Sequence, residues 1–162
     1  MSQPVSTGSS AIGRWAWLFP LAYGLHIAEE HWLHFPDWVS QLSGSFVTDP
    51  QFLFLNGAFW LLMAISVAAI RARTSMAWLI VTLATILAIN AALHLLGSAV
   101  TRSYSPGSFT AAFLYVPLVL HAFRQVLPRI TRGLALRAAA LGAVVHAGVM
   151  LVAANSWLLP SI

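Results

Sequence analysis

Long apolar runs separated by short polar connections dominate the sequence. A helix that crosses a bilayer needs about 20 mostly apolar residues. Five runs reach or approach that length, at residues 11–32, 51–70, 76–100, 109–127 and 134–158. No internal repeat relates the runs to one another. The pattern therefore predicts an all-α fold, a polytopic membrane helix bundle of about five transmembrane helices.

The composition leads to the same class of protein. Of the 162 residues, 59% are hydrophobic and 7% are charged, and the mean hydropathy is +0.81. Soluble domains contain roughly 25% charged residues, whereas a protein in lipid can be as apolar outside as inside. We therefore expect one transmembrane helical bundle domain over residues 11–162, preceded by a polar, disordered N-terminus at residues 1–10.

The positions of the basic residues predict an orientation. Every basic residue is Arg, and the arginines stand at the ends of the apolar runs. If successive helices alternate in direction, all of them except Arg102 fall on one side. Cytoplasmic connections are rich in Arg and Lys, so we expect a bacterial-type inner or plasma membrane protein with a cytoplasmic N-terminus and a C-terminus on the far side. This reading needs no nucleic acid partner for the net charge of +4.

Several kinds of chemistry are excluded by the residues that are missing. The sequence has no cysteine, so disulfides, thiolate metal sites and cysteine nucleophiles are ruled out. It also shows no nucleophile elbow, P-loop or dinucleotide fingerprint. Any metal ion must therefore be held by His, Glu, Asp or backbone oxygen.

Ionisable side chains interrupt the end of the first predicted helix. At about 100° per residue, His26, Glu29, Glu30 and His34 share one helix face with Tyr23. Spacings of three and four residues bring the imidazole of His26 beside both carboxylates. Such a cluster can hold a metal ion, or it can form an acid/base pair in which each group tunes the pKa of the other. The alternative is that Glu29 and Glu30 simply end the helix in interfacial water.

The other predicted helices carry isolated polar side chains in apolar surroundings: Asn56, Asn90, His94, His121 and His146. If the helices alternate, Asn56, Asn90 and His94 lie toward the same leaflet as the end of the first helix, and His146 lies near mid-membrane. These side chains can therefore converge with the first-helix cluster. Taken singly, His121 and His146 more often serve as hydrogen-bonding groups between helices.

The longest connection, residues 33–50, has two interpretations. It contains Trp38 and several other aromatic residues, and Trp is typical of the headgroup interface. The segment can form an interfacial helix or a cap over the bundle. It can also be a plain exposed loop.

Two short motifs resemble those of a known family. His26-Ile-Ala-Glu29-Glu30 matches the H-x-x-E-E signature of the HXXEE-domain family of small integral membrane proteins, and residues 104–107 match its Y-x-P-G motif. His94 resembles the further histidine of that family. The resemblance covers residues 25–107. It implies which residues matter, Tyr104 among them as a catalytic candidate, but the family carries no established biochemical function.

The favoured hypothesis is a membrane enzyme that acts on a lipid or isoprenoid substrate. His26, Glu30 and His94 would bind a divalent metal such as Zn, Fe or Mn, with Glu29 as a fourth ligand or general base and His146 as an extension of the ligand set. Two histidines and one glutamate are a known ligand set of catalytic zinc. In a variant without metal, the two glutamates and His26 would isomerise a double bond by acid/base chemistry.

Two other classes of function remain open. A small transporter, sensor or binding protein would use the same cluster for a metal ion or protons. A structural membrane subunit would use the polar residues only to hold helices together. The expected partners are membrane lipid and a hydrophobic small molecule contacted by Tyr23, Asn56 and Asn90, and a homo-oligomer is possible.

Overall fold

The structure is a computed structural model that describes residues 14–44, 47–155 and 158–160. The predicted disordered N-terminus, residues 1–10, lies outside the described residues. The described part of the chain is helical and contains no strand. The prediction of an all-α bundle is confirmed.

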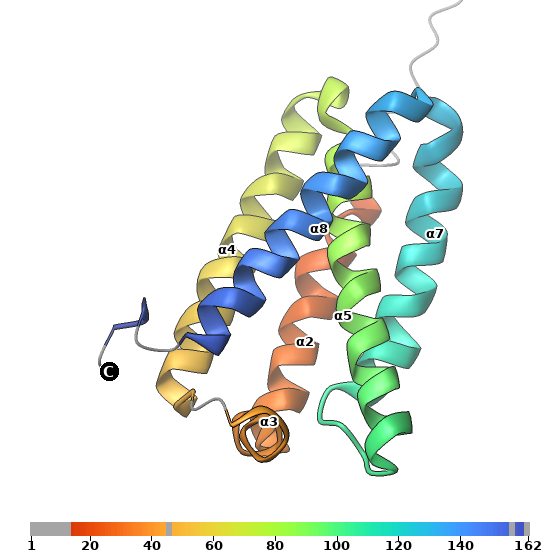
Figure 1. The fold of residues 1–162 in the computed structure, drawn as a ribbon. Helices are drawn as coiled ribbons and strands as arrows, with labels where there is room; N and C mark the ends of the chain where they lie inside the picture. The colour runs from red at the N-terminus through yellow and green to blue at the C-terminus, as the bar shows by residue number, and fades with distance from the viewer. Residues whose placement is uncertain (1–13, 45–46, 156–157, 161–162) are drawn as a thin grey trace, which may run out of the picture.

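Five long helices stand side by side, and successive ones alternate in direction (Figure 1). They are α2 (Leu18–Trp32), α4 (Asp49–Ala72), α5 (Leu79–Thr101), α7 (Val116–Val126) and α8 (Arg132–Ala154). Shorter elements join them: α3 (Phe35–Ser43), α6 (Ser108–Thr110), the π-helix η2 (Ala111–Tyr115) and the 3-10 turns η1 (Thr74–Met76) and η3 (Leu127–Arg129). Because η2 links α6 to α7 without a break, these elements form one continuous rod.

Four helices of the described chain are long and apolar enough to cross a membrane. They are α4, α5, α8 and the continuous rod Ser108–Arg129. Many large apolar side chains of these helices are exposed, which suits a surface that faces lipid. The first helix, α2, has 15 residues and is shorter than the predicted span 11–32. The sidedness of the termini stays a prediction.

The end of α2 departs from the predicted pattern. His34 adopts a left-handed conformation with φ 55°, and Pro36 follows within the first turn of α3. This backbone ends α2 at Trp32 and starts a new helix in another direction. The expectation that His34 shares a face with Glu30 is therefore wrong, because the helix ends before it, and His34 is exposed.

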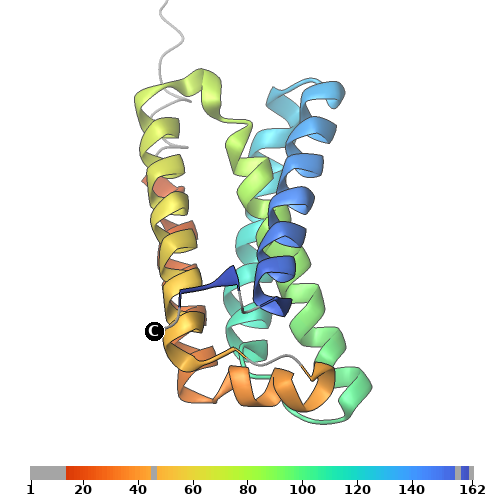
Figure 2. The same ribbon diagram turned by 60° about the vertical axis from the view of Figure 1, so that its left-hand side comes forward.

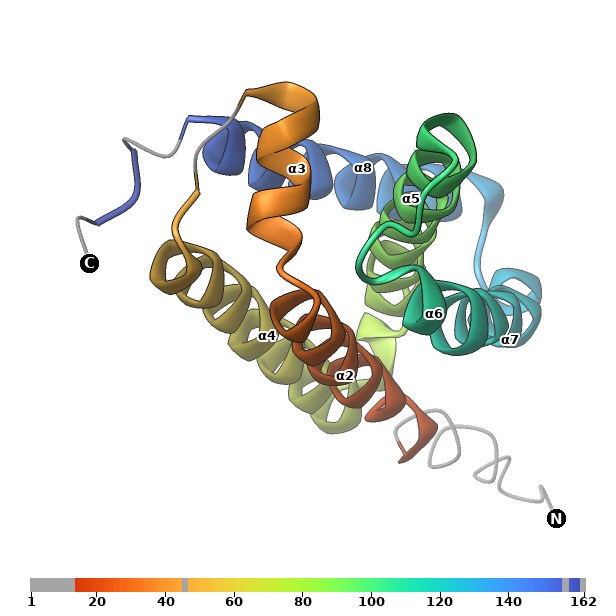
Figure 3. The same cartoon turned by 90° about the horizontal axis from the view of Figure 1, so that it is seen from below.

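The connection between α2 and α4 forms a cap. Helix α3 lies across one end of the bundle, as the view along the helices shows (Figure 3). Its Phe35, Trp38 and Val39 line the interior of the bundle. The plain-loop interpretation of residues 33–50 is wrong for the nine residues of α3, and the cap interpretation holds there.

The bundle consists of two packed groups of helices. Helix α2 packs mainly against α4, whereas α5 packs against α7 and α8 (Figure 2). Helices α5 and α8 run in the same direction and approach closely at Gly142, where an added Cβ would lie 2.6 Å from the backbone oxygen of Thr82. The Thr82 hydroxyl donates to the carbonyl of Ala138 at 3.0 Å. These contacts fix the register of α8 on α5.

We predict that Gly142→Ala destabilises the protein and that Gly148→Ala does not. The added methyl group at residue 142 must push α8 away from α5, and such overpacking costs about 1–3 kcal/mol. Gly148 lies on the same helix, and an added Cβ there would have nothing within 4 Å. Thermal unfolding in detergent measures both variants. Equal effects of the two substitutions would contradict the tight α5–α8 contact.

Candidate functional site

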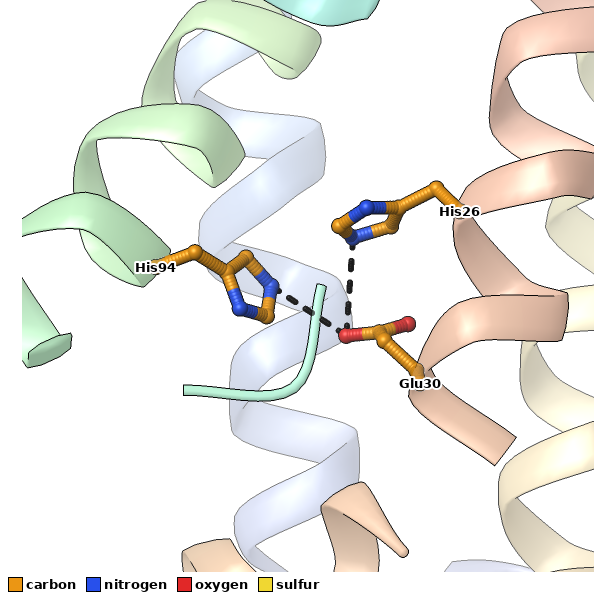
Figure 4. Close-up of side chains that lie close together, drawn as sticks. All are labelled: His26, Glu30 and His94. Atoms are coloured by element: carbon orange, nitrogen blue, oxygen red, sulfur yellow. Dashed lines mark ion pairs between the residues drawn. The ribbon is translucent and has the colours of Figure 1, made fainter. Parts of the chain in front are cut away.

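Three ionisable side chains from two helices meet inside the bundle (Figure 4). His26 and Glu30 stand one turn apart on α2, and His94 projects from α5. Glu30 Oε1 lies 3.5 Å from His26 Nε2 and 3.2 Å from His94 Nε2. All three side chains are buried, and one ligand atom from each lies within 4.8 Å of the others. We call this group the His–Glu trio.

The other ring nitrogen of each histidine meets a hydroxyl group. His26 Nδ1 lies 2.7 Å from Thr110 Oγ1, and His94 Nδ1 lies 3.2 Å from Ser105 Oγ. The Thr110 hydroxyl also lies 3.2 Å from the carbonyl oxygen of Gly107, so it can pair with His26 Nδ1 as donor or as acceptor according to the tautomer of the imidazole. In either tautomer the other ring nitrogen of His26, Nε2, faces Glu30 Oε1. A hydrogen bond at the outer nitrogen is the usual support of a metal-bound histidine.

Residues 102–107, which we call the covering loop, close over the two imidazoles. Gly107 has φ 96°, and an added Cβ there would lie 2.7 Å from Cε1 of His26 and 2.9 Å from Cε1 of His94. Only glycine combines that backbone conformation with so close an approach. The glycine of the Y-x-P-G sequence thus brings the main chain directly onto the trio.

Glu29 has different partners from Glu30. Its carboxylate accepts hydrogen bonds from the backbone N–H groups of Gly107 and Phe109 at 3.1 Å and of Thr110 at 2.8 Å, and from the hydroxyl of Tyr104. These N–H groups belong to the start of α6, where a helix has free donors and favours a negative charge. Glu29 therefore fastens the covering loop and the start of the α6–α7 rod to α2.

Tyr104 lies at the surface of the covering loop and is half exposed. Partial burial and the hydrogen bond to the Glu29 carboxylate raise the pKa of its phenol, so the phenol stays protonated as a donor to Glu29 at neutral pH. The structure connects Tyr104 to the loop anchor rather than to the trio.

An apolar cavity of about 320 Å³ adjoins the trio. Its walls come from α2, α3, α4, α5 and α8, and Glu30 and His94 form part of them. The remaining polar side chains on its walls are Tyr23, Asn56, Asn90, Ser105 and His146. The Tyr23 hydroxyl donates to Asn56 Oδ1 at 2.7 Å. A cavity of this size, mostly apolar with a few convergent polar groups, is typical of a small-molecule site.

Buried polar atoms without a hydrogen-bond partner gather around the trio and the cavity. Within the described residues they are His26 Nε2 in the trio, Asn90 Oδ1 and His146 Nε2 on the cavity wall, and Tyr115 OH, whose ring packs on His26. His31 Nδ1 also lacks a partner there but belongs neither to the trio nor to the cavity wall. An unsatisfied buried polar group costs about 1–3 kcal/mol, and native proteins contain few of them. Their concentration here indicates a place where a bound group supplies the partners.

Sequence reasoning missed three residues of this site. Thr110 and Ser105 support the histidines, and the ring of Tyr115 lies 4.6 Å from the ring of His26. Tyr115 ends the π-helix η2, an element often found at functional sites. The one signal in the sequence was a tyrosine within an otherwise apolar run, which does not reveal its partner.

Other predicted residues lie outside the trio. The metal-ligating group of the described residues contains neither Glu29 nor His146, and His146 lines the cavity instead. His121 is exposed and packs against Trp15 with ring centroids 4.8 Å apart. The predicted substrate contacts Tyr23, Asn56 and Asn90 all lie on the cavity wall.

Comparison with known proteins finds one family. A family model described as a protein of unknown function with HXXEE motif matches residues 17–122. The matched segment includes the trio, the covering loop and Tyr115, and it ends before α8. Neither the curated proteins nor the solved structures give a match.

We predict that Gly107→Ala disrupts the site far more than Gly44→Ala. Both glycines have positive φ, 96° and 69°, but only Gly107 has neighbours that an added Cβ would meet. Backbone strain costs about 1 kcal/mol or more at either position, and the clash with both imidazoles adds to it at Gly107. Thermal unfolding of both variants separates the two effects. Equal losses would show that the loop does not press on the trio.

We also predict that Glu29→Ala lowers stability by about 2–3 kcal/mol, whereas Tyr104→Phe lowers it by about 1 kcal/mol or less. The first change leaves several N–H groups at the start of α6 without an acceptor, and the second removes a single donor. Chemical denaturation in detergent measures both. A larger loss for Tyr104→Phe would mean that the phenol, and not the carboxylate, anchors the loop.

Proposed function

The chain belongs to the family of proteins of unknown function with an HXXEE motif, and from its site we propose a metal-dependent membrane enzyme. In this proposal His26, Glu30 and His94 hold one divalent metal ion. The substrate is an apolar molecule, a lipid or isoprenoid, that occupies the adjoining cavity.

The observation that carries the proposal is the convergence of three buried side chains, His26, Glu30 and His94, whose ligand atoms lie within 4.8 Å of one another. His26 Nε2 is buried without a hydrogen-bond partner and faces the Glu30 carboxylate at 3.5 Å. A metal ion bound among the three side chains would compensate the buried carboxylate and give His26 Nε2 a partner. Nitrogen and oxygen ligands bind zinc at about 2.0–2.2 Å, so two ligands of a tetrahedral ion lie about 3.3 Å apart. The separations of 3.5 Å and 3.2 Å within the trio suit that spacing.

The donor set limits the metal and its chemistry. Two imidazoles and one carboxylate without thiolate suit zinc, iron or manganese, and three protein ligands leave a position open. A metal held by these residues would supply Lewis-acid chemistry and would activate water. The chain itself holds the imidazoles through Thr110 and Ser105, and the covering loop excludes bulk water from one side.

The cavity supports an apolar substrate. Its lining is mostly aliphatic and aromatic, and α4 and α8, which contribute two of its walls, also carry exposed apolar side chains on their outer surfaces. A lipid-soluble molecule can therefore partition from the bilayer into the cavity beside Glu30 and His94. We accordingly propose hydrolysis or oxidation of such a molecule as the class of reaction.

One observation favours a second candidate without metal. His94 Nε2 and Glu30 Oε1 lie 3.2 Å apart, a distance that also suits a direct hydrogen bond without metal. The trio would then act as an acid/base pair in an isomerase, or carry protons in a small transporter or sensor. Metal content distinguishes this candidate from the first.

We expect the purified protein to hold close to one zinc, iron or manganese ion per chain, measured by elemental mass spectrometry. Glu30→Gln and His94→Ala should lose the metal while staying folded, because each removes a ligand. His121→Ala is the matched control, since His121 is exposed and lies outside the trio. Absence of metal from the wild type after reconstitution with each ion would refute the metal enzyme and leave the acid/base candidate.

The variant Thr110→Val tests whether the Thr110 hydroxyl supports metal binding by His26. It removes the hydroxyl that pairs with His26 Nδ1 and preserves the shape of the side chain. Loss of such a supporting bond typically weakens metal affinity by about 10–100-fold. Competition with a chelator of known affinity measures the change. Unchanged affinity would argue against His26 as a ligand.

A further inference from the structure

Two polar side chains on the cavity wall remain outside the trio and lack partners. Asn90 on α5 and His146 on α8 both line the cavity. Asn90 Oδ1 and His146 Nε2 are buried without a hydrogen bond among the described residues. His146 as a whole is 7% exposed. Their neighbours on the same wall include the apolar Leu87 and Val149, and also His94 of the trio, one turn from Asn90 on α5.

The register of α5 and α8 places Asn90 and His146 the same number of residues beyond a shared contact. Both helices run toward the α3 end of the bundle and cross one another (Figure 1), and the bond from Thr82 to Ala138 ties them together. Asn90 follows Thr82, and His146 follows Ala138, by the same step of eight residues. At 1.5 Å per residue each lies about 12 Å farther along its own helix, in the direction of the α3 end, and both line the cavity.

The other polar groups on the cavity wall behave differently. Tyr23 donates to Asn56 at 2.7 Å, and the amide of Asn56 donates to the carbonyl of Phe52 at 2.9 Å. Polar residues that only hold helices together are bonded in this way across or along the helices. Asn90 Oδ1 and His146 Nε2 have no such bond within the described chain, so helix packing alone does not account for them.

The hydrogen-bonding groups of Asn90 and His146 indicate the chemical class of ligand that can satisfy both. The amide oxygen of Asn90 only accepts, whereas His146 Nε2 can donate. A hydroxyl group can donate to the first and accept from the second at the same time. An ether or carbonyl oxygen only accepts and leaves Asn90 Oδ1 unsatisfied. Among the described residues no arginine lines the cavity, so a carboxylate or phosphate group would lack a fixed countercharge.

We propose that Asn90 and His146 form a hydroxyl-binding subsite and that the ligand of the cavity is a neutral apolar alcohol. Its hydroxyl group lies between the two side chains, and its hydrocarbon fills the rest of the cavity beside the trio. The inference rests on the proposed function only in treating the cavity as the substrate site. The cavity volume of about 320 Å³ is within the range of small-molecule sites.

Binding of radiolabelled farnesol and of its methyl ether, to full-length protein in lipid nanodiscs, tests the subsite. The two probes share their hydrocarbon and differ in the ability to donate. We expect the wild type to bind the alcohol about tenfold more tightly than the ether, which is the size of one good hydrogen bond. Asn90→Leu and His146→Phe should bind the two probes equally. Thr85→Val is the control, because the Thr85 hydroxyl bonds within its own helix and lies outside the cavity.

Thermal stability of the ligand-free variants separates a binding role from a structural one. Removal of an unsatisfied buried polar group by an apolar one of similar shape is neutral or stabilising. We therefore expect Asn90→Leu and His146→Phe to unfold at or above the wild-type temperature. Lower stability together with an unchanged preference for the alcohol would overturn the subsite and assign both residues to helix packing.

The variant Glu30→Gln tests the subsite separately from the metal proposal, because it removes a proposed metal ligand and leaves Asn90 and His146 unchanged. If the subsite exists, Glu30→Gln loses the metal and still prefers the alcohol. A preference lost in Glu30→Gln but kept in Asn90→Leu would put the hydroxyl at the trio and overturn the subsite alone. The wild type could also contain no metal and still prefer the alcohol over the ether in a way that depends on Asn90 and His146. That result would uphold the subsite and refute the metal enzyme. No preference in a metal-loaded wild type would overturn the subsite only.

Discussion

A carboxylate buried among apolar helices must be compensated, and Glu30 imposes this constraint on the whole bundle. Removing a charge from water is costly unless an opposite charge or hydrogen bonds replace the solvent. His26 lies one turn away on the same helix, whereas His94 comes from α5. The compensation of Glu30 therefore joins the α2–α4 group of helices to the α5–α7–α8 group, so site and fold depend on the same contacts.

The neighbouring carboxylates Glu29 and Glu30 have different roles. Glu30 faces the histidines, while Glu29, about 100° around the helix, receives the free N–H groups at the start of α6. Through Glu29 the covering loop is fastened to α2, and through Gly107 it presses on both imidazoles. The loop also supplies Ser105, a hydroxyl partner of His94. Glu29, the sequence neighbour of Glu30, thus holds in place the loop that surrounds the trio.

The cavity follows from how the two groups of helices meet. The helices pack most extensively within each group, as at Gly142 between α5 and α8, and α3 closes the end of the space between the groups. Polar atoms without partners among the described residues collect around that space and the trio. In a mostly apolar bundle such atoms are costly, and a ligand that satisfies them would be bound both by apolar contact and by hydrogen bonds.

Hydropathy and helical spacing are local properties of the chain, and they were enough to predict the membrane class, the approximate spans and the residues of the HXXEE segment. The sequence also indicated that His94 joins His26 and Glu30, since alternating helices bring them to the same depth. The folded chain was needed to show that Glu29 leaves the cluster and that α2 ends before His34. It was also needed to show that Thr110, Ser105 and Tyr115 surround the histidines. Those outcomes depend on the rotation of each helix, on a left-handed residue and on a π-turn. A few tens of degrees of helix rotation change the neighbours of a side chain without any change in the hydrophobic pattern.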